Sequence, residues 1–234
     1  MNFLKHAIRK ILLGHKSTSN DYVNYLRKKG ASIGEGVIIY SPNHTYIDEM
    51  FPFMLTIGNN VNITQGVHIL NHDFSWSVIK AKYGTIIGGV GKVVIGNNVF
   101  IGVNSIILMN TEVGDNVIIG SGSVVHGKIP ANSVVAGSPA KVICTIEEFY
   151  DKRKKRQYDE AASVVIAYRN KFGVNPPKEA LPAYFFLFEQ RTENISPVFL
   201  QRMKLGGNLS ETMNSFMNSS PMFESYEAFL NSIR

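Results

Sequence analysis

Residues 95–141 read IGNNVFIGVNSIILMNTEVGDNVIIGSGSVVHGKIPANSVVAGSPAK and repeat with a period of six. Each hexad opens with an aliphatic residue, namely Ile95, Ile101, Ile107, Val113, Ile119, Val125 and Ala131. An α-helix repeats about every 3.6 residues and a half-buried strand about every two, so neither explains this period. A short period held over this length predicts a solenoid, in which each coil stacks its inward residue on the previous coil.

The other positions of the hexad support the same interpretation. Glycine follows most of the aliphatic positions, as at Gly96, Gly102, Gly114 and Gly120. A small or β-branched residue stands four places after each aliphatic position. Each hexad therefore predicts one short strand and one corner, where Gly or Asn would tolerate a positive φ.

The end of the repeat carries a more specific pattern: Gly120-Ser-Gly-Ser-Val-Val, then Ile129-Pro, then Ala136-Gly-Ser-Pro-Ala-Lys-Val-Ile143. This pattern resembles the last coil of the hexapeptide-repeat acyltransferases, in particular their sugar O-acetyltransferase branch, which includes galactoside, maltose and surface-polysaccharide O-acetyltransferases. The resemblance covers roughly residues 33–143 and implies a mainly β fold, a left-handed parallel β-helix. The handedness comes from the resemblance alone, because crossovers between parallel strands are normally right-handed.

The composition is that of a folded protein: of 234 residues, 44% are hydrophobic and 18% are charged. The single cysteine, Cys144, excludes an internal disulfide and favours a reducing, cytoplasmic location. We expect neither a signal peptide nor a membrane span, because the apolar runs are too short. The net charge of +6 would suit a phosphorylated cofactor, a membrane surface or nucleic acid, so charge alone does not decide among them.

We divide the chain into an N-terminal helical segment (1–30), a β-helix (31–143) and a C-terminal helical extension (144–234). In the first segment, residues at helical spacing form an apolar stripe: Phe3, Leu4, Ala7, Ile8, Ile11 and Leu12. With basic residues opposite the stripe, this helix could lie peripherally on a membrane surface. We favour a cover for the first coil, because the terminal coils of a solenoid need one. A second short helix is expected from Asp21 to Lys29.

The phase of the repeat locates an insertion. The hexads run in phase through Ile69, apart from poor positions at Thr45 and Phe51. From Ile69 to Ile95 the gap is 26 residues, which is four hexads and two further residues. A loop is therefore expected to leave the solenoid at about residues 70–93, and loops on rigid scaffolds often carry functional residues.

The C-terminal extension has a helical pattern. Thr145 and Glu148 match a capping box at the start of its first helix. Helices are expected at about 146–171, 178–190, 201–204 and 222–233. The extension would cover the final coil or make oligomer contacts. Its basic run, residues 152–156, could hold phosphate groups, although such runs are more often solvated helix faces.

His72 is the candidate catalytic residue. It stands at the mouth of the loop in the sequence Asn71-His-Asp-Phe-Ser. This motif resembles the loop of the sugar O-acetyltransferases, whose histidine is the general base. A sugar hydroxyl attacks the thioester of acetyl-CoA poorly unless its proton is removed, and imidazole can accept that proton at pH 7. A surface histidine beside Asp73 would be the alternative interpretation.

Asn43 and His44 are candidates for acceptor binding, because the resemblance implies an acceptor-binding asparagine in this irregular segment. His68 should point outwards from the solenoid. His68 and His72 would also fit a γ-type carbonic anhydrase, which binds zinc through three histidines. A third ligand with suitable spacing is missing from the sequence, so we expect no metal.

The resemblance implies that acetyl-CoA binds along the last coils. Phe100, next to Gly102, stands where the family often has a tryptophan beside the pantetheine arm of CoA. Ser121 and Gly122 match small residues that line this arm, where the backbone must approach the cofactor closely. Lys141 matches a basic residue that contacts the phosphates of the nucleotide end.

These residues together predict an acetyl-CoA-dependent O-acetyltransferase that acts on a hydroxyl of a sugar or glycan precursor. N-acetylation of an amino sugar is the alternative reaction. A scaffold without catalytic activity is disfavoured, because the loop, the small-residue coil and Lys141 occur in one chain. The resemblance also implies a homotrimer with active sites between subunits, and no nucleic-acid partner is expected.

Overall fold

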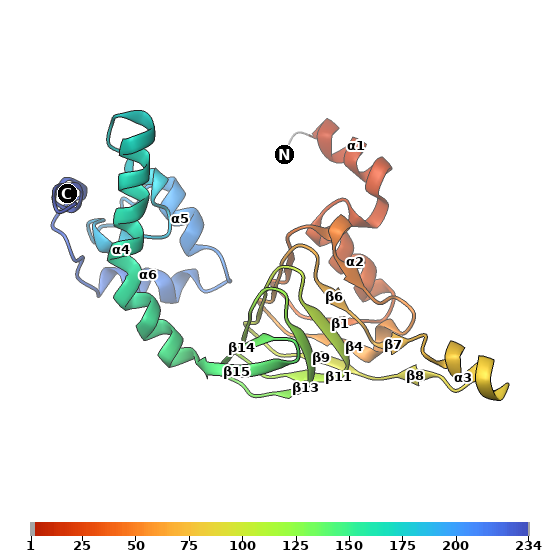
Figure 1. Cartoon of the computed structure of the whole chain (residues 1–234). Helices are drawn as coiled ribbons and strands as arrows, with labels where there is room; N and C mark the ends of the chain where they lie inside the picture. Colours follow the sequence, from red (N-terminus) through yellow and green to blue (C-terminus); the bar gives the residue numbers. More distant parts are fainter. Residues whose placement is uncertain (1–2, 234) are drawn as a thin grey trace. The chain divides into compact units, whose positions relative to one another are not determined.

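The hexads form a parallel β-solenoid whose strands occupy three faces in turn (Figure 1). The computed structural model describes residues 3–233, and the side chains of residues 8–233. The chain forms two compact units, Met1–Phe149 and Tyr150–Arg234. The solenoid lies in the first unit.

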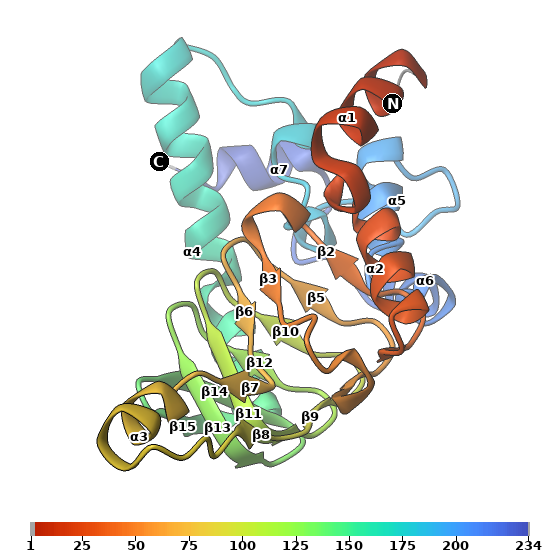
Figure 2. The same cartoon turned by 90° about the vertical axis from the view of Figure 1, so that its right-hand side faces the viewer.

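Strands of successive coils lie side by side on each face (Figure 2). The first face contains β2 (Ile38–Ile39), β5 (Asn62–Ile63), β10 (Phe100–Ile101), β12 (Ile118–Ile119) and β14 (Ser133–Gly137). The second contains β3 (Tyr46–Ile47), β6 (His68–Ile69) and the first parts of β11 (Ile106–Val113) and β13 (Val124–Ile129). The third contains β1 (Ser32–Ile33), β4 (Leu55–Ile57), β9 (Val93–Ile95) and the second parts of β11 and β13. The pairing between these coils is parallel.

One regular coil contains three hexads. Ile101 pairs with Ile119, eighteen residues later on the same face. The first and fifth residues of a hexad both point inwards, as Ile101 and Ser105 show, each with 0% exposure. The hydroxyl of Ser105 donates to the backbone oxygen of Gly120 (3.0 Å), which allows a polar side chain in the interior. The six-residue period is therefore the length of one face.

Asparagine and glycine have different roles at the corners. Asn98, Asn104 and Asn116 have positive φ values of 54°, 58° and 56°, as predicted. For the glycines after the aliphatic positions the prediction is wrong, because Gly96 does not adopt a positive φ. A Cβ atom at Gly96 would lie 2.5 Å from Oδ1 of Asp115 on the next coil. Glycine is needed there because the backbones of stacked coils approach closely.

The last coil is shorter than a regular one. Val113 pairs with Ile129, sixteen residues later instead of eighteen. The inward residue is therefore Ile129, and Ala131, which the hexad count places inside, is exposed.

The first coil is longer than a regular one. Ile33 pairs with Ile57, so the coil contains twenty-four residues. The extra residues form the 3₁₀ turns η2 (Pro42–His44) and η3 (Pro52–Met54). On the second face the inward strand residue is consequently Ile47, two residues after the expected Thr45.

An insertion leaves the solenoid between the second and third faces. Ile69 and Ile95 occupy consecutive inward strand positions, although they are 26 residues apart instead of six. The inserted residues form β7 (His72–Asp73), α3 (Trp76–Tyr83) and β8 (Gly89–Val90), and β7 pairs antiparallel with β8. The helix and hairpin project from the solenoid (Figure 1), and His72 is the first residue of β7.

Helix α2 (Ser19–Lys28) covers the first coil. The side chain of Thr18 caps its N-terminus by accepting a hydrogen bond from the backbone N–H of Asp21 (3.1 Å). Tyr22 and Leu26 are completely buried and belong to the same hydrophobic core as the inward residues of the solenoid. The predicted cover is thus provided by α2.

Helix α1 (Phe3–Leu13) does not provide that cover with its described side chains. Ile11 and Leu12 are 83% and 76% exposed. The short turn η1 (Gly14–Lys16) connects α1 to the residues before α2. The side chains of residues 3–7, which the predicted apolar stripe includes, lie outside the described part of the structure.

The solenoid ends in a hairpin and a capped helix. Strand β15 (Ala140–Thr145) turns back and pairs antiparallel with β14. The predicted capping box is confirmed, because the backbone N–H of Thr145 donates to Glu148 Oε2 (2.9 Å) and that of Glu148 donates to Thr145 Oγ1 (3.1 Å). Helix α4 (Ile146–Phe172) starts here and ends before Gly173, which has a φ of 70°.

The second unit has an aromatic core of its own. Phe185, Phe199 and Phe216 are buried in it, and the guanidinium of Arg191 lies 4.4 Å from the ring centre of Phe216. Its elements after α4 are η4 (Lys178–Ala180), η5 (Phe185–Leu187), α5 (Pro197–Met203), α6 (Leu209–Met217) and α7 (Tyr226–Asn231).

These elements correct the predicted helices of the extension. The expected helix at 178–190 is wrong, because Pro182 interrupts it and only two 3₁₀ turns form. The one expected at 201–204 overlaps the end of α5, and α6 lies outside the predicted ranges. Within residues 3–233, no helix combines the length and the apolar character that crossing a membrane requires.

Candidate active site

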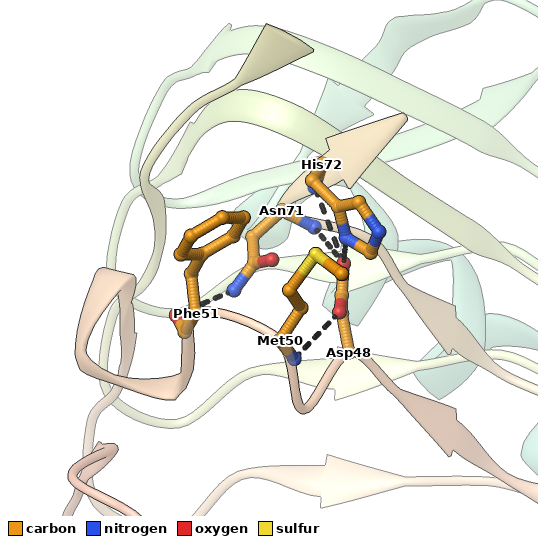
Figure 3. Close-up of polar contacts among 5 residues, drawn as sticks. All are labelled: Asp48, Met50, Phe51, Asn71 and His72. Atoms are coloured by element: carbon orange, nitrogen blue, oxygen red, sulfur yellow. Dashed lines mark hydrogen bonds and ion pairs between the residues drawn. The ribbon is translucent and has the colours of Figure 1, made fainter. Parts of the chain in front are cut away.

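Two segments that are distant in the sequence meet at one corner of the solenoid. Asp48 directly follows β3, and His72 stands three residues after the end of β6. Because β3 and β6 pair in parallel with Ile47 opposite Ile69, the residues that leave these strands lie close together. Figure 3 shows Asp48, Asn71 and His72 meeting at this corner.

Asp48 is a buried carboxylate, 2% exposed. Its Oδ2 accepts hydrogen bonds from the backbone N–H groups of Asn71 and His72 (3.2 Å each) and contacts Nδ1 of the His72 ring. Its Oδ1 accepts from the backbone N–H of Met50 (3.0 Å). These contacts compensate the carboxylate for its loss of water and fix its position.

This carboxylate orients the imidazole of His72. An ionised carboxylate only accepts, so beside it Nδ1 is the donor, and in the neutral form of the imidazole Nε2 then keeps its lone pair. Figure 3 shows Nε2 on the side of the ring that faces away from Asp48. The ring of Phe51 meets the imidazole edge-on, with centroids 5.9 Å apart, and 23% of the His72 side chain is exposed. The arrangement has the geometry of an oriented base whose side chain is partly exposed.

The neighbours of His72 in the sequence have other partners. Oδ1 of Asp73 accepts from the hydroxyl of Ser75 (2.7 Å) and from its backbone N–H (2.9 Å), and these bonds lower the pKa of Asp73. The side chain of Asn71 donates to the backbone oxygen of Phe51 (2.7 Å). Its buried Oδ1 has no hydrogen-bond partner among the residues that the structure describes.

Two of the residues predicted to bind acetyl-CoA lie on the first face and in the final hairpin. Phe100 is 42% exposed and lines a groove of 370 Å³ with Asn62, Asn116 and Ile146 among its other walls. Lys141 is exposed on β15, opposite Ala136 of β14.

The other predicted acetyl-CoA residues lie at the corner between the first and second faces. Gly102 packs against the next coil, where a Cβ atom would be 2.5 Å from the backbone nitrogen of Ser121. Gly122 has a φ of 70° in the same turn as Ser121. His72 lies at the opposite end of the second face, because it follows β6. The structure thus groups Gly102, Ser121 and Gly122, and it places His72 at a different corner.

Asn43 and His44 lie in the turn η2 and are exposed. Within the described residues, neither side chain has a hydrogen bond to His72 or Asp48. Their role in acceptor binding stays a prediction. The irregular segment contributes Asp48 and Phe51 to the site.

Comparison with known proteins identifies the family of the chain. The family model described as bacterial transferase hexapeptide (six repeats) matches residues 92–127, within the regular coils. Protein CapG of Staphylococcus aureus is 37% identical over 157 residues, which cover 64% of this chain and 88% of that protein. The chain belongs to the bacterial hexapeptide transferases.

Two further relatives carry names of acetyltransferases. The putative acetyltransferase YvoF of Bacillus subtilis is 31% identical over 134 residues, covering 57% of this chain and 70% of that protein. The putative lipopolysaccharide biosynthesis O-acetyl transferase WbbJ of Escherichia coli is 35% identical over 124 residues, covering 48% and 62%. This hexapeptide transferase is therefore an acyltransferase, and its curled parallel sheet is a left-handed-β-helix-like fold, as the resemblance implies.

Sequence reasoning missed Asp48 in this hexapeptide transferase. The sequence feature that could have revealed it is a pair of inward aliphatic residues, Ile47 and Ile69, that lie side by side on one face and are each followed by polar residues. Counting by six places Thr45, rather than Ile47, at the inward strand position, and so the pairing of Ile47 with Ile69 is hidden. With the correct register, Asp48 lies beside the residues that follow Ile69.

Proposed function

We propose that this transferase is an acetyl-CoA-dependent O-acetyltransferase that modifies a hydroxyl of a sugar or glycan precursor. The observation that carries the proposal is the contact between Nδ1 of His72 and the buried carboxylate of Asp48, which leaves Nε2 free. The similarity to WbbJ, whose name specifies O-acetyl transfer in lipopolysaccharide biosynthesis, supports a sugar hydroxyl as the acceptor.

His72 and Asp48 each have a role in the proposed reaction. Nε2 of His72 takes the proton from the acceptor hydroxyl as its oxygen attacks the carbonyl carbon of the thioester. The carboxylate of Asp48 stabilises the imidazolium that forms and keeps the ring in its orientation. When the carbon–sulfur bond breaks, the imidazolium returns the proton to the CoA thiolate. The products are an O-acetylated acceptor and free CoA thiol.

The residues present fit acetyl-CoA as the co-substrate. The groove at Phe100 offers an apolar wall beside amide side chains, which suits a pantetheine arm. In the turn of Ser121, a Cβ atom at Gly122 would meet no atom within 4 Å, so a ligand can approach the backbone closely there. Lys141 is an exposed cation that could contact a phosphate group.

A trimer would bring the two halves of the site together. In one chain, His72 and the corner of Gly102 lie at opposite ends of the second face. A closed three-fold assembly would place the His72 corner of one copy beside the acetyl-CoA corner of the next. We therefore propose a homotrimer with its active sites between subunits.

The location of the reaction follows from its chemistry. A single cysteine and the use of acetyl-CoA support a cytoplasmic reaction. The exposed Ile11 and Leu12 of α1, beside the exposed Arg9, would allow a peripheral contact with a membrane surface.

An acceptor screen tests this function. The protein is incubated with acetyl-CoA and a panel of neutral sugars, amino sugars and glycan precursors, and the release of free thiol is followed. Mass spectrometry then identifies the product, and mild alkali distinguishes an ester from an amide. Thiol release that yields an alkali-labile acetyl sugar supports the proposal. An alkali-stable product on amino sugars alone would assign N-acetylation instead, and turnover with no sugar acceptor would reject the proposed acceptor class.

A further inference from the structure

Glu49 connects the segment that carries Asp48 to the N-terminal residues. The hydroxyl of Tyr25 donates to Oε2 of Glu49 at 2.8 Å, and Nε2 of His15 lies 3.8 Å from Oε1. The ring of His15 stacks on that of Tyr25, with centroids 3.8 Å apart and an interplanar angle of 11°. We refer to His15, Tyr25 and Glu49 as the Glu49 clasp.

The clasp has a rigid base in α2. Tyr25 belongs to this helix, and its neighbours Tyr22 and Leu26 are completely buried in the core of the solenoid. At the start of the helix, Oγ of Ser19 accepts a hydrogen bond from the backbone N–H of Ile39 (2.8 Å). Because packed cores resist displacement, the clasp holds Glu49 to a fixed point.

The segment that the clasp holds has little regular structure of its own. Strand β3 is two residues long and lies between the turns η2 and η3. The backbone N–H of Asp48 donates to the backbone oxygen of Ile69 (2.9 Å), and Glu49 follows immediately. The contacts of these adjacent residues show that Asp48 faces His72 while Glu49 faces α2. A rotation of this backbone would move the Asp48 carboxylate and, with it, the imidazole.

We propose that Glu49 is a positioning residue for catalysis: the clasp fixes the Asp48 carboxylate and thereby the orientation of His72. This inference rests on the proposed role of His72 as the general base. Displacement of a reacting group by about 1 Å can cost roughly 100-fold in rate. Loss of the clasp is therefore expected to lower kcat by about 10- to 100-fold while the KM for acetyl-CoA stays within about twofold.

Three variants test the clasp. Glu49→Ala removes both of its contacts, and Tyr25→Phe removes only the hydroxyl that donates to Glu49. Both should lower kcat, and the double variant should be no slower than Glu49→Ala, because the two residues act as one unit. Glu49→Gln keeps an oxygen that can accept from Tyr25, so it should restore kcat to within about threefold of wild type. If Glu49→Ala does not fold, Tyr25→Phe, Glu49→Gln and the control below still decide the question.

Ser19→Ala is the matched control. It removes a hydrogen bond of similar length between α2 and the first coil without touching Glu49. It should lower the melting temperature about as much as Tyr25→Phe and leave kcat unchanged. A wild-type kcat in Tyr25→Phe, or an equal loss of kcat in Ser19→Ala, would overturn the positioning role and leave a purely structural contact.

A spectroscopic measurement separates this inference from the proposed function. In protein labelled with ¹⁵N-histidine, the Nδ1–H proton of His72 should give a low-field NMR signal that moves upfield in Asp48→Asn, because the charge of the acceptor is lost. The signal should shift or broaden in Tyr25→Phe and remain as in wild type in Ser19→Ala. If no acceptor is turned over but this pattern appears, the proposed function fails while the positioning contact stands. An unchanged signal in Tyr25→Phe refutes the inference, whatever the activity.

Discussion

Replacing Asp48 by asparagine is the perturbation whose effect the structure specifies most closely. The side chain keeps its size, so its oxygen can still accept from the backbone N–H groups of Asn71 and His72. The negative charge beside Nδ1 of His72 is lost. In the proposed reaction this charge faces an imidazolium during proton transfer, and the uncharged amide cannot stabilise it.

The size of the effect follows from the burial of the site. Asp48 is 2% exposed, so its charge is poorly screened. Two unit charges about 4 Å apart interact by about 4 kcal/mol at an effective dielectric constant of about 20. Loss of that stabilisation in the transition state corresponds to about a 1,000-fold decrease in kcat. The KM for acetyl-CoA should change little, because the carboxylate does not face the predicted acetyl-CoA corner.

The assay is steady-state thiol release with the acceptor found in the screen, measured on variants whose circular dichroism matches that of wild type. Asp73→Asn is the matched control, because Asp73 is also next to His72 in the sequence but bonds to Ser75. It should keep kcat within about threefold, since its carboxylate does not orient the imidazole. The reasoning fails if Asp48→Asn retains the wild-type kcat, or if Asp73→Asn loses as much.

Three further predictions concern other parts of the chain. Lys141→Ala should raise the KM for acetyl-CoA about 3- to 10-fold with little change in kcat, because an exposed charged contact contributes weak, uniform binding. Lys128→Ala, which removes another exposed lysine of the last coil, should change neither constant. Equal effects of the two substitutions would make Lys141 an ordinary surface residue. Light scattering should give the mass of three 26.0 kDa chains, and mixing His72→Ala with Lys141→Ala subunits should restore activity at low acetyl-CoA; an active monomer would exclude shared sites. Hydrogen bonds, first from Ser17 and then from Thr18, lower the pKa of Asp21 from 3.8 to about 2, so its contribution to stability is full above about pH 4 and is lost as the pH falls through 2. Asp21→Asn should therefore remove about 1–2 kcal/mol of unfolding free energy at pH 7 and less at pH 2, measured by denaturant titration; an equal loss at both pH values would contradict the assignment.

The sequence predicts the regular coils well because their period is a local property. Ile101 and Ser105 occupy inward positions that recur every six residues along the sequence. Stacking of the coils requires both residues to be buried. The count fails where a coil changes length, as at Ala131, because register depends on pairing with another strand rather than on local spacing. The second unit shows the same limit, since its short helices are determined by packing around Phe199 and Phe216.

The candidate site was predictable in part for the same reason. His72 follows a regular hexad, and the resemblance of its motif identifies it. Asp48 follows an irregular segment, where the 3₁₀ turn η2 shifts the register by two residues. The partner of His72 therefore depends on a long-range pairing that periodicity does not reveal. Glycine follows most of the inward aliphatic residues, but Gly96 is required by the close approach of the coils rather than by its φ.

The central claim is that His72 is the general base of acetyl transfer, and His72→Ala tests it most directly. The measurement compares kcat with the dissociation constant for acetyl-CoA on the same preparation of the variant. We predict that kcat falls by about 10²- to 10⁴-fold, the usual contribution of a general base, while the affinity for acetyl-CoA stays within about twofold. Acetyl transfer by His72→Ala at the wild-type rate would contradict the account.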